Sequence, residues 1–319
     1  MDRFFEPSID KVDVMSLTVI IPTYNGGCLW KESAKAISTQ LMNIDQIKVI
    51  DSSSKDDTRE VAKSFGFDVY VIDQKDFDHG GTRSIALEGV ATDLVVFLTQ
   101  DALLNSNDAI SKLIAIFDEA DDIVCAYGRQ LPHIDANPLA QHARYNSYKE
   151  QGYVTGLDDH FPMGFRKAFI SNSFAAYRTD FLRSIGAFPK HLILGEDAYV
   201  AAKALSAGKR VAYVAESHVL HSHNYSTFEE FKRYFDIGVF HTTQSWMVKQ
   251  LGGVEGEGVK FALDQIKYVI KQNKYPWVFK SIFASLAKYL GYKLGKKHKI
   301  LGPKISRKLS MYKSYWNRV

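Results

Sequence analysis

The sequence contains little cysteine and no long apolar run. Cys28 and Cys125 are the two cysteines among 319 residues, which argues against a disulfide framework and favours a reducing compartment such as the cytosol. No stretch approaches about 18 uncharged apolar residues, so a membrane-spanning helix is not expected. Residues 1–16 carry acidic side chains and no apolar core of signal-peptide length, so we expect no export signal.

Acidic residues are missing from the end of the chain. Residues 265–319 contain 14 Lys or Arg and no Asp or Glu, although the whole chain has 40 basic and 36 acidic residues. The part before residue 265 therefore has 26 basic residues against 36 acidic ones. An acidic body with a basic tail indicates that the tail meets an anionic surface.

The glycine motifs of two large nucleotide-binding classes are also absent. The chain has neither G-x-G-x-x-G nor G-x-x-x-x-G-K-[ST], which argues against a dinucleotide dehydrogenase and against a P-loop enzyme. The basic tail lacks the aromatic and glycine signatures of RNA-binding modules, so nucleic acid is not an expected partner.

Short strand patterns alternate with helical patterns in the first hundred residues. The strands are expected at Leu17–Pro22, Ile47–Asp51, Val69–Ile72 and Asp93–Leu98, and the helices at Trp30–Leu41, Asp56–Phe65 and Thr82–Val90. This alternation predicts βαβ units and an α/β fold with a mostly parallel central sheet flanked by helices. The pattern breaks near Leu251–Gly258, so we expect a catalytic or binding domain over residues 1–250 and a helical appendage over residues 259–319.

Polar side chains follow the ends of the predicted strands. Thr23 and Asn25 follow the first strand, Asp51 closes the second, and Asp101 follows the apolar run that ends at Leu98. In open parallel sheets, ligands bind beyond the carboxyl ends of the strands. The residues are therefore candidates for one cleft, although each of them alone is also an ordinary helix cap or turn residue.

Six motifs occur in the order found in the family 2 glycosyltransferases. They are TVIIPTYNGG (18–27), VIDSSSKDDT (49–58), DFDHGGTRS (76–84), FLTQDA (97–102), GEDAYVAAKALSAGKRVAYV (195–214) and HVLHSHNYS (218–226). The chain resembles this family over about residues 16–250, and more narrowly it resembles the bacterial rhamnosyltransferases within it.

The resemblance implies the GT-A fold, a nucleotide-sugar donor, a divalent metal and inversion at the anomeric carbon. It also implies dTDP-β-L-rhamnose as the donor and a growing, lipid-linked surface polysaccharide such as O-antigen as the acceptor. Transfer of a hexose from a UDP-sugar is the alternative reaction. A different class, a non-catalytic nucleotide-sugar-binding or membrane-docking module, is the alternative function. The resemblance and the basic tail together imply a cytoplasmic enzyme held peripherally on the inner face of the cell membrane.

Two segments are candidates for donor binding. Pro22, Thr23, Tyr24 and Asn25 would form a loop over the base and ribose, and the Asp51 carboxylate can accept the N3–H of uracil or thymine. In the second segment, Gly80 and Gly81 would let the backbone of a helix N-terminus approach the diphosphate. His79 and Arg83 in this segment are further candidates for donor binding, and so is Gln100, which precedes Asp101. The plain alternative for this second segment is a glycine turn capped by Asp78.

The chain departs from its family at the expected metal motif. Family 2 enzymes usually carry Asp-x-Asp, whereas this chain has Thr99-Gln100-Asp101 and so offers one carboxylate. Mg²⁺ often binds through one or two carboxylates with phosphates and water, and imidazole is a further possible ligand. The motif register favours His221, with His223 second, and either Mg²⁺ or Mn²⁺ as the metal. Histidines in a loop are also ordinary polar residues.

An inverting transfer needs one base that takes the proton of the acceptor hydroxyl. The resemblance assigns this role to Asp197, with Glu196 in support, although acids in the first turn of a helix also stabilise its dipole. Asn172 and Arg178 lie in a stretch that resembles the acceptor side of the family, and they are weaker candidates.

The basic tail has the spacing of an amphipathic helix over Trp277–Leu294. An apolar helix face bordered by lysines can lie in an anionic membrane surface. The same face could instead pack on the catalytic domain or on a second subunit, so a homo-oligomer is a further possibility.

Overall fold

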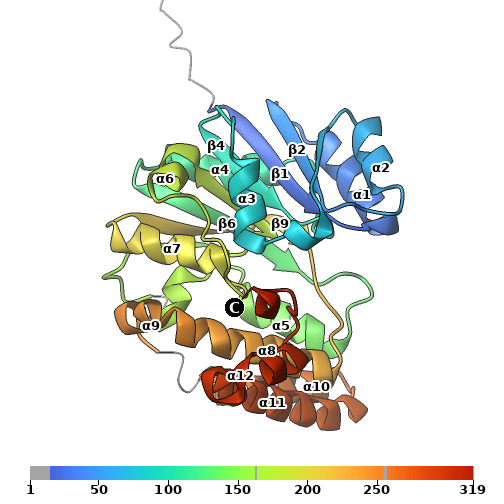
Figure 1. The fold of residues 1–319 in the computed structure, drawn as a ribbon, viewed down its shortest axis with the longest axis vertical. Coiled ribbons are helices and arrows are strands. Elements are labelled where there is room, and N and C mark those ends of the chain that lie inside the picture. The colour runs from blue at the N-terminus through green and yellow to red at the C-terminus, as the bar shows by residue number, and fades with distance from the viewer. Residues whose placement is uncertain (1–14, 162–163, 254–256, 319) are drawn as a thin grey trace, which may run out of the picture.

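The structure is a computed structural model that describes residues 15–161, 164–253 and 257–318 (Figure 1). Residues 1–14, where no export signal is expected, lie outside the described residues. So do residues 254–256, which belong to the predicted break at Leu251–Gly258. Among the described residues no helix is long and apolar enough to cross a membrane.

The first half of the fold is a parallel sheet with a helix between successive strands, as the sequence predicts. Its elements are β1 (Leu17–Thr23), α1 (Gly27–Ser38), β2 (Gln46–Asp51), α2 (Thr58–Ser64), β3 (Asp68–Val71), α3 (His79–Ala86) and β4 (Leu94–Leu98). Strand β1 pairs in parallel with both β2 and β4, and β2 pairs in parallel with β3. The carboxyl ends of all four strands therefore meet at one edge of the sheet.

The second half of the sheet is mixed. Its elements are β5 (Leu103–Leu104), α4 (Ala109–Ile114), β6 (Ile123–Leu131), α5 (Pro138–Ser147), β7 (Tyr153–Thr155), β8 (Phe174–Arg178), α6 (Thr179–Ser184), α7 (Glu196–Ser206) and β9 (Arg210–Leu220). Strand β8 lies between β4 and β6 and is antiparallel to both. Within the described residues, nine strands form one sheet, with the main order β3-β2-β1-β4-β8-β6-β9-β5. The mostly parallel sheet of the prediction is thus confined to its first half and the β6–β9 pair.

The sheet is buried on both faces, because successive side chains of a strand point to opposite sides. In β4, Val95 and Phe97 join one apolar cluster, whereas Leu94, Val96 and Leu98 join the other. Helices α1, α2 and α4 cover the second cluster, and α3, α6 and α7 cover the first.

A helical unit follows the sheet. It comprises α8 (Thr227–Thr243), α9 (Ser245–Leu251), α10 (Glu257–Lys271), α11 (Pro276–Gly295) and α12 (His298–Leu309), and α8 begins with a capping box between Ser226 and Glu229. Helices α8 and α11 lie side by side beneath the sheet domain (Figure 1). Short 3₁₀ turns occur at Gln74–Asp76, Ala115–Asp118, Gly164–Ala168 and Tyr315–Asn317.

Glycine allows α8 and α11 to approach to backbone contact. A Cβ atom on Gly291 would collide with the carbonyl oxygen of Phe231, and one on Gly295 with that of Phe235. On the facing helix, a Cβ on Gly238 would collide with the carbonyl oxygen of Tyr292. Residues four apart share one helix face, so Gly291 and Gly295 form a continuous strip without side chains.

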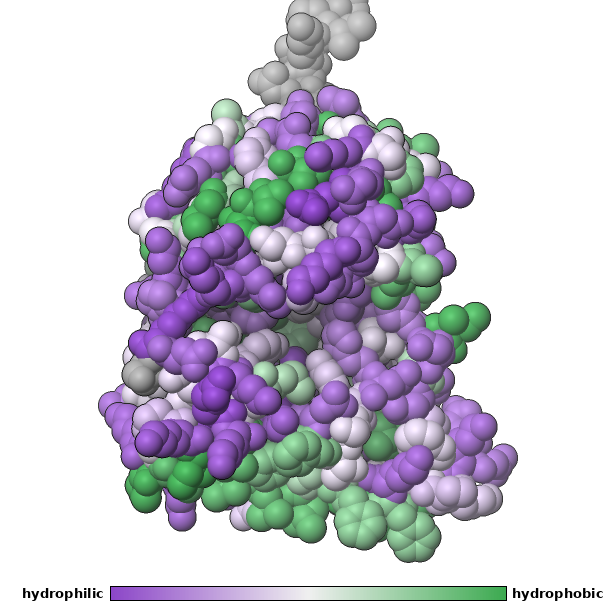
Figure 2. Space-filling model, turned by 45° about the vertical axis from the view of Figure 1, so that its right-hand side comes forward, coloured by the Kyte–Doolittle hydropathy of each residue, from purple (hydrophilic) through white to green (hydrophobic). Residues whose placement is uncertain are grey.

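Helix α11 has two opposite faces. Its inner face, which packs against the rest of the unit, consists of Ser281, Ala284, Lys288, Gly291 and Gly295. Its outer face is apolar and exposed, and we call it the α11 patch: Phe279, Ile282, Phe283, Leu286, Tyr289 and Leu290. Hydrophobic residues gather along the lower end of the molecule, where α10 and α11 lie (Figure 2). One face of this helix therefore packs against the rest of the protein, and a different face is exposed at the surface.

We predict that Gly295→Ala destabilises the protein by about 1–3 kcal/mol, because the added methyl group forces the two helices apart. Gly258→Ala is the matched control, since a Cβ at Gly258 in α10 meets no atom within 4 Å. Urea denaturation measures both free energies of unfolding. Equal values for Gly295→Ala and wild type would show that the helices are not in backbone contact.

Candidate active site

One carboxylate and two imidazoles meet beyond the end of β4. The Asp101 Oδ2 atom lies 3.5 Å from His221 Nε2 and 3.9 Å from His223 Nε2. One possible ligand atom from each residue lies within 4.8 Å of the others. Asp101 follows β4, and the two histidines follow β9, so strands far apart in the sequence bring this cluster together.

The orientation of His221 suits a metal ligand. Its Nδ1 atom lies 2.9 Å from the Gln130 Oε1 atom, which can only accept a hydrogen bond. Nδ1 is therefore occupied by the contact with Gln130, and Nε2 is the ring nitrogen that faces Asp101. Burial lowers the pKa of His221, which keeps the imidazole neutral at neutral pH. A neutral imidazole held by an outer hydrogen bond is the form in which histidine binds metals.

The Asp101 carboxylate is ionised. Burial alone would raise the pKa of Asp101, but the adjacent His221 side chain holds it well below its usual value. Thr99 stands where the family usually carries the first acid, so Asp101 is the one carboxylate of this motif. One anionic oxygen and two neutral nitrogens form a donor set that fits a divalent cation.

Glu196 and Asp197, adjacent in the first turn of α7, have different environments. Glu196 is buried, and its Oε1 atom lies 3.1 Å from Arg83 Nη1 and accepts a hydrogen bond of 3.1 Å from Asn172 Nδ2. Although burial opposes it, the Arg83 charge lowers the pKa of Glu196. Glu196 is therefore an ionised group whose charge is already compensated.

Asp197 is partly exposed, and no ion pair to it is present in the described part of the chain. Its carboxylate accepts hydrogen bonds from the backbone N–H groups of Asn172 (3.1 Å) and Ala198 (2.8 Å). Burial, and then the charge of Glu196, raise the pKa of Asp197 to about 7. A carboxylate with such a pKa can take up a proton near neutral pH.

Helix α7 and the cluster of Asp101, His221 and His223 are joined through one short segment. Asn172 N bonds to Asp197, and Ser173 O accepts a hydrogen bond of 3.4 Å from Thr99 N. Thr99 lies two residues before Asp101 in the same loop. Asp197 and Asp101 therefore lie at the same edge of the sheet.

The first predicted donor loop is held from two sides. The Gln100 side chain accepts a hydrogen bond from Tyr24 N (2.8 Å) and donates one to Tyr24 O (3.0 Å). Asn25 has a positive φ of 47° and bonds to Ser54 Oγ through its backbone N–H (2.8 Å). Pro22 and Thr23 end strand β1 directly before these residues. Tyr24 and Asn25 are exposed, so this loop can contact a ligand.

Asp51 lies where the sequence predicts but faces inward. Its side chain is fully buried, and its carboxylate accepts hydrogen bonds from Thr23 Oγ1 (3.0 Å), Ser54 N (2.8 Å) and Ser54 Oγ. The sequence analysis expects this carboxylate to bind the edge of a nucleotide base. In this conformation its oxygens are instead buried and occupied by protein donors. Its carboxylate instead ties the loop after β1 to the loop after β2.

The second predicted donor segment forms the N-terminus of α3, which Asp78 caps through Gly81 N at 2.6 Å. Gly80 is required for packing, because a Cβ there would collide with the carbonyl oxygen of Pro189. The guanidinium of Arg83 is buried, and its Nη1 atom donates to the His79 carbonyl oxygen (2.8 Å) and lies 3.1 Å from Glu196 Oε1. The expectation that Arg83 contacts the donor is therefore corrected: the helix geometry directs it to α7. His79 is partly exposed at this N-terminus, and burial lowers its pKa.

The two acceptor candidates are not at the surface of the site. Strand β8 runs antiparallel to β4, and its last residue, Arg178, pairs with Leu94 at the start of β4. Arg178 therefore lies at the edge of the sheet opposite to Asp101. There it donates to the carbonyl oxygens of Ile123 (3.0 Å) and Phe117 (2.7 Å). Arg178 as an acceptor residue is therefore wrong. Asn172 does lie at the site, but it is buried and supports Glu196.

The structure adds two arginines that the sequence analysis misses. Arg144 on α5 donates to Gln130 Oε1 at 2.9 Å and so supports His221 indirectly. Arg233 on α8 lies over the ring of Tyr225 at 5.8 Å, and its charge acts on both His79 and His223. Within the described residues Arg233 has neither a hydrogen bond nor an ion pair. A single arginine in FKRYF carries no motif that would have identified it.

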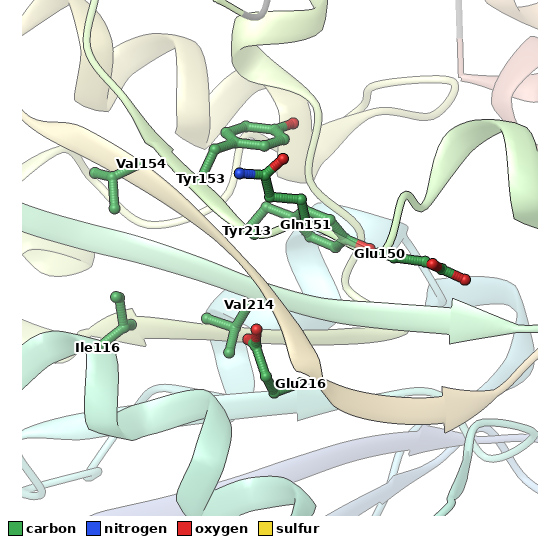
Figure 3. A pocket seen from close by; sticks show the side chains of 9 residues that line it. Ile116, Glu150, Gln151, Tyr153, Val154, Tyr213, Val214 and Glu216 are labelled. Carbon is green, nitrogen blue, oxygen red and sulfur yellow. The ribbon is translucent and has the colours of Figure 1, made fainter.

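A separate groove of about 520 Å³ is lined by the paired strands β7 and β9, by Ile116 and by residues 150–152 (Figure 3). Ile116, Val154 and Val214 form its apolar side, next to Glu216. None of the residues predicted for donor, metal or proton transfer lines this groove.

Comparison with known proteins identifies the family. The model of "Glycosyl transferase family 2" matches residues 18–186. O-antigen chain rhamnosyltransferase RfbN from Salmonella typhimurium (strain LT2) is 46% identical over 308 residues, which cover 96% of this chain and 97% of the relative. O-antigen chain rhamnosyltransferase WbaN from Salmonella anatum is 43% identical over 306 residues, 95% of this chain and 96% of the relative.

Solved structures show the same fold. Mannosyltransferase PcManGT from Pyrobaculum calidifontis, in complex with GDP-Man and Mn²⁺, has a TM-score of 0.56 at 17% identity and covers 95% of this chain and 85% of its own. S. aureus TarS 1–349 has a TM-score of 0.53 at 16% identity, and the match covers 90% of this chain and 92% of the TarS chain. These similarities and the ordered motifs lead to one conclusion: the chain belongs to glycosyl transferase family 2, and its sheet and helices form the GT-A fold.

Proposed function

We propose that this glycosyltransferase moves L-rhamnose from dTDP-β-L-rhamnose to a hydroxyl group of a growing, lipid-linked surface polysaccharide, with inversion. The observation that carries the reaction class is the arrangement at one sheet edge: a carboxylate with a raised pKa, Asp197, beside the cation-binding set around Asp101. The two rhamnosyltransferase relatives, aligned over nearly the whole chain, support the sugar and the acceptor class.

Asp197 is the proposed base. It takes the proton of the acceptor hydroxyl while that oxygen attacks the anomeric carbon from the side opposite to the leaving diphosphate. Glu196 is a positioning group, because its charge is held by Arg83 and Asn172. One base and no second free carboxylate at this point fit a single displacement, which inverts the configuration.

The donor lies between the loop of residues 22–25 and the N-terminus of α3 in this proposal. Gln100 and Asp51 shape the first loop, and His79 and the backbone at Gly80 and Gly81 face the diphosphate. Arg233 supplies an unpaired positive charge between His79 and His223, where the diphosphate must pass. Helix N-termini and arginine both favour phosphate oxygens.

Asp101, His221 and His223 would hold the divalent cation, which when bound supplies positive charge to the leaving diphosphate. Two imidazoles in the donor set favour Mn²⁺ over Mg²⁺, because Mg²⁺ binds mainly through carboxylate, phosphate and water oxygens. Gln130 and Arg144 keep His221 in its ligand orientation.

Residues 1–250 form the proposed catalytic domain, and residues 259–319 carry the proposed membrane contact. The α11 patch is apolar, and Lys280 and Lys293 lie over the rings of Trp277 (4.2 Å) and Tyr289 (5.6 Å) beside it. Basic residues at an anionic surface contribute about 1 kcal/mol each. We infer a cytoplasmic enzyme docked peripherally on the inner membrane face, where a lipid-linked acceptor is within reach.

We expect purified protein with Mn²⁺ to release nucleoside diphosphate from dTDP-rhamnose and not from UDP-glucose or UDP-galactose. Asp101→Ala should abolish Mn²⁺-dependent donor binding, measured by calorimetry, and His221→Ala should weaken it less. Release from a UDP-sugar alone would replace rhamnose by a hexose. Donor binding by Asp101→Ala equal to wild type would contradict the cation site.

Asp197→Asn should lower kcat by about 10²–10⁴-fold with little change in donor affinity, because the lost group acts on the acceptor. Since the base must be ionised, kcat/KM of the wild type should rise with pH through about 7 and then level off. Steady-state kinetics across pH measures both. Wild-type turnover in Asp197→Asn would exclude it as the base.

The double variant Phe279→Ser, Phe283→Ser should lose sedimentation with anionic vesicles at low salt, because it removes two large side chains of the α11 patch. Leu41→Ser is the matched control, since Leu41 is an exposed apolar residue remote from α11 in the sequence. Failure of the wild type to sediment with these vesicles would assign the patch to a second copy of the chain, which sedimentation equilibrium detects.

A further inference from the structure

The last residues of the chain return from the helical unit to the donor side of the active site. After α12 ends at Leu309, residues 310–318 run upward, and the C-terminus lies near the centre of the molecule, between α7 and α8 (Figure 1). We call residues 310–318 the C-terminal segment. It crosses from the unit that carries the α11 patch to the loop before α3.

The C-terminal segment is fastened at its base to α8. The Asp236 Oδ2 atom accepts hydrogen bonds from the backbone N–H groups of Met311 (2.8 Å) and Tyr312 (3.3 Å). Trp316 is 6% exposed and packs against Phe235 and His298. These contacts give the segment a defined path and not only a surface association.

Its far end binds the loop that leads into α3. The Arg318 guanidinium donates to the carbonyl oxygens of Lys75 (2.6 Å) and Phe77 (3.3 Å), and it lies 3.4 Å from Asp78 Oδ2. Asp78 uses its other oxygen to cap α3 at Gly81. Arg318 therefore holds both the loop backbone and the carboxylate that starts the donor helix.

Tyr312 makes the second contact. Its ring meets His79 edge to face at 4.8 Å, and Phe77 meets His79 from another side at 5.1 Å. The imidazole at the start of α3 is therefore held between two aromatic rings. A small cavity of about 150 Å³ is enclosed between Tyr312, Tyr315 and Arg318 on one side and Asp78, His79 and His191 on the other.

The loop that these residues hold has little other support. Residues 73–76 are exposed and form a single 3₁₀ turn. A loop that is disordered before binding must lose conformational entropy when the ligand binds, which weakens affinity. Contacts that order the loop beforehand remove that cost.

We propose that Arg318 and Tyr312 are positioning residues of the donor site, which hold residues 74–79 and the N-terminus of α3 ready for the donor diphosphate. This inference rests on the proposed function, in which the diphosphate lies at that N-terminus. Neither residue contacts Asp197, Asp101, His221 or His223 in the described structure. Their loss should therefore affect donor binding and not the chemical step.

The test is Arg318→Ala in the full-length protein. We expect the KM for dTDP-rhamnose to rise about tenfold with kcat within about twofold of wild type, as for the loss of charge-assisted hydrogen bonds. Arg318→Lys should recover part of the affinity because it keeps the charge. Arg307→Ala, an exposed arginine on α12, is the matched control and should match wild type.

Amide hydrogen exchange of residues 74–79 without donor is the second measurement. Exchange should become faster in Arg318→Ala and in Tyr312→Ala, and it should stay near wild type in Tyr312→Phe, which keeps the ring on His79. This measurement does not depend on the donor, so it still decides whether the segment orders the loop if dTDP-rhamnose is not the substrate.

The outcomes separate the two proposals. An unchanged donor KM and unchanged exchange in Arg318→Ala overturn the positioning role and leave the proposed function intact. Faster exchange in Arg318→Ala, together with no binding of dTDP-rhamnose by the wild type, overturns the assigned donor and retains the ordering of the loop. A fall in kcat without a change in KM also overturns the inference, because it would place Arg318 in the chemical step.

Discussion

The buried ion pair between Arg83 and Glu196 is the interaction on which the active site depends. It joins α3, whose N-terminus is the proposed diphosphate site, to α7, which carries the proposed base. By compensating Glu196, it leaves Asp197 as the uncompensated acid of the pair, and the charge of Glu196 then raises the pKa of Asp197. Removing either partner would leave a buried charge without compensation, which is strongly destabilising. Two adjacent acids thus acquire different roles from one arginine.

The helical unit forms the other wall of the site. Gly238, Gly291 and Gly295 let α11 lie directly on α8, and Asp236 of α8 binds the backbone of the C-terminal segment. The same unit exposes an apolar face on its outside and sends its last residues to the donor loop. The proposed sites of donor binding, proton transfer and surface contact therefore share one packed framework, even though the sequence divides into an acidic body and a basic tail.

For several site residues, the sequence predicts the position along a strand or helix but not what the side chain contacts. Asp51 ends β2 as expected, yet its carboxylate turns inward to Thr23 and Ser54. Gly80 starts α3 as expected, yet Pro189 and not a ligand excludes a side chain there. The prediction for Arg178 is wrong because β8 runs antiparallel to β4, which places Arg178 at the edge of the sheet opposite to the site. Periodicity locates a residue along an element, but the neighbouring element decides what its side chain meets.

The strands and helices of the first half can be predicted from the sequence because they depend on local periodicity, and the common edge where parallel strands end places Asp101 at a site. His221 and His223 come from the resemblance to the family motifs, and the structure brings both beside Asp101. The sequence alone does not show that Arg83 pairs with Glu196, that the charge of Arg233 acts on both His79 and His223, or that Arg318 reaches Asp78. These contacts join residues up to 240 positions apart. No local pattern encodes such pairs, because they form only when packing brings distant elements together.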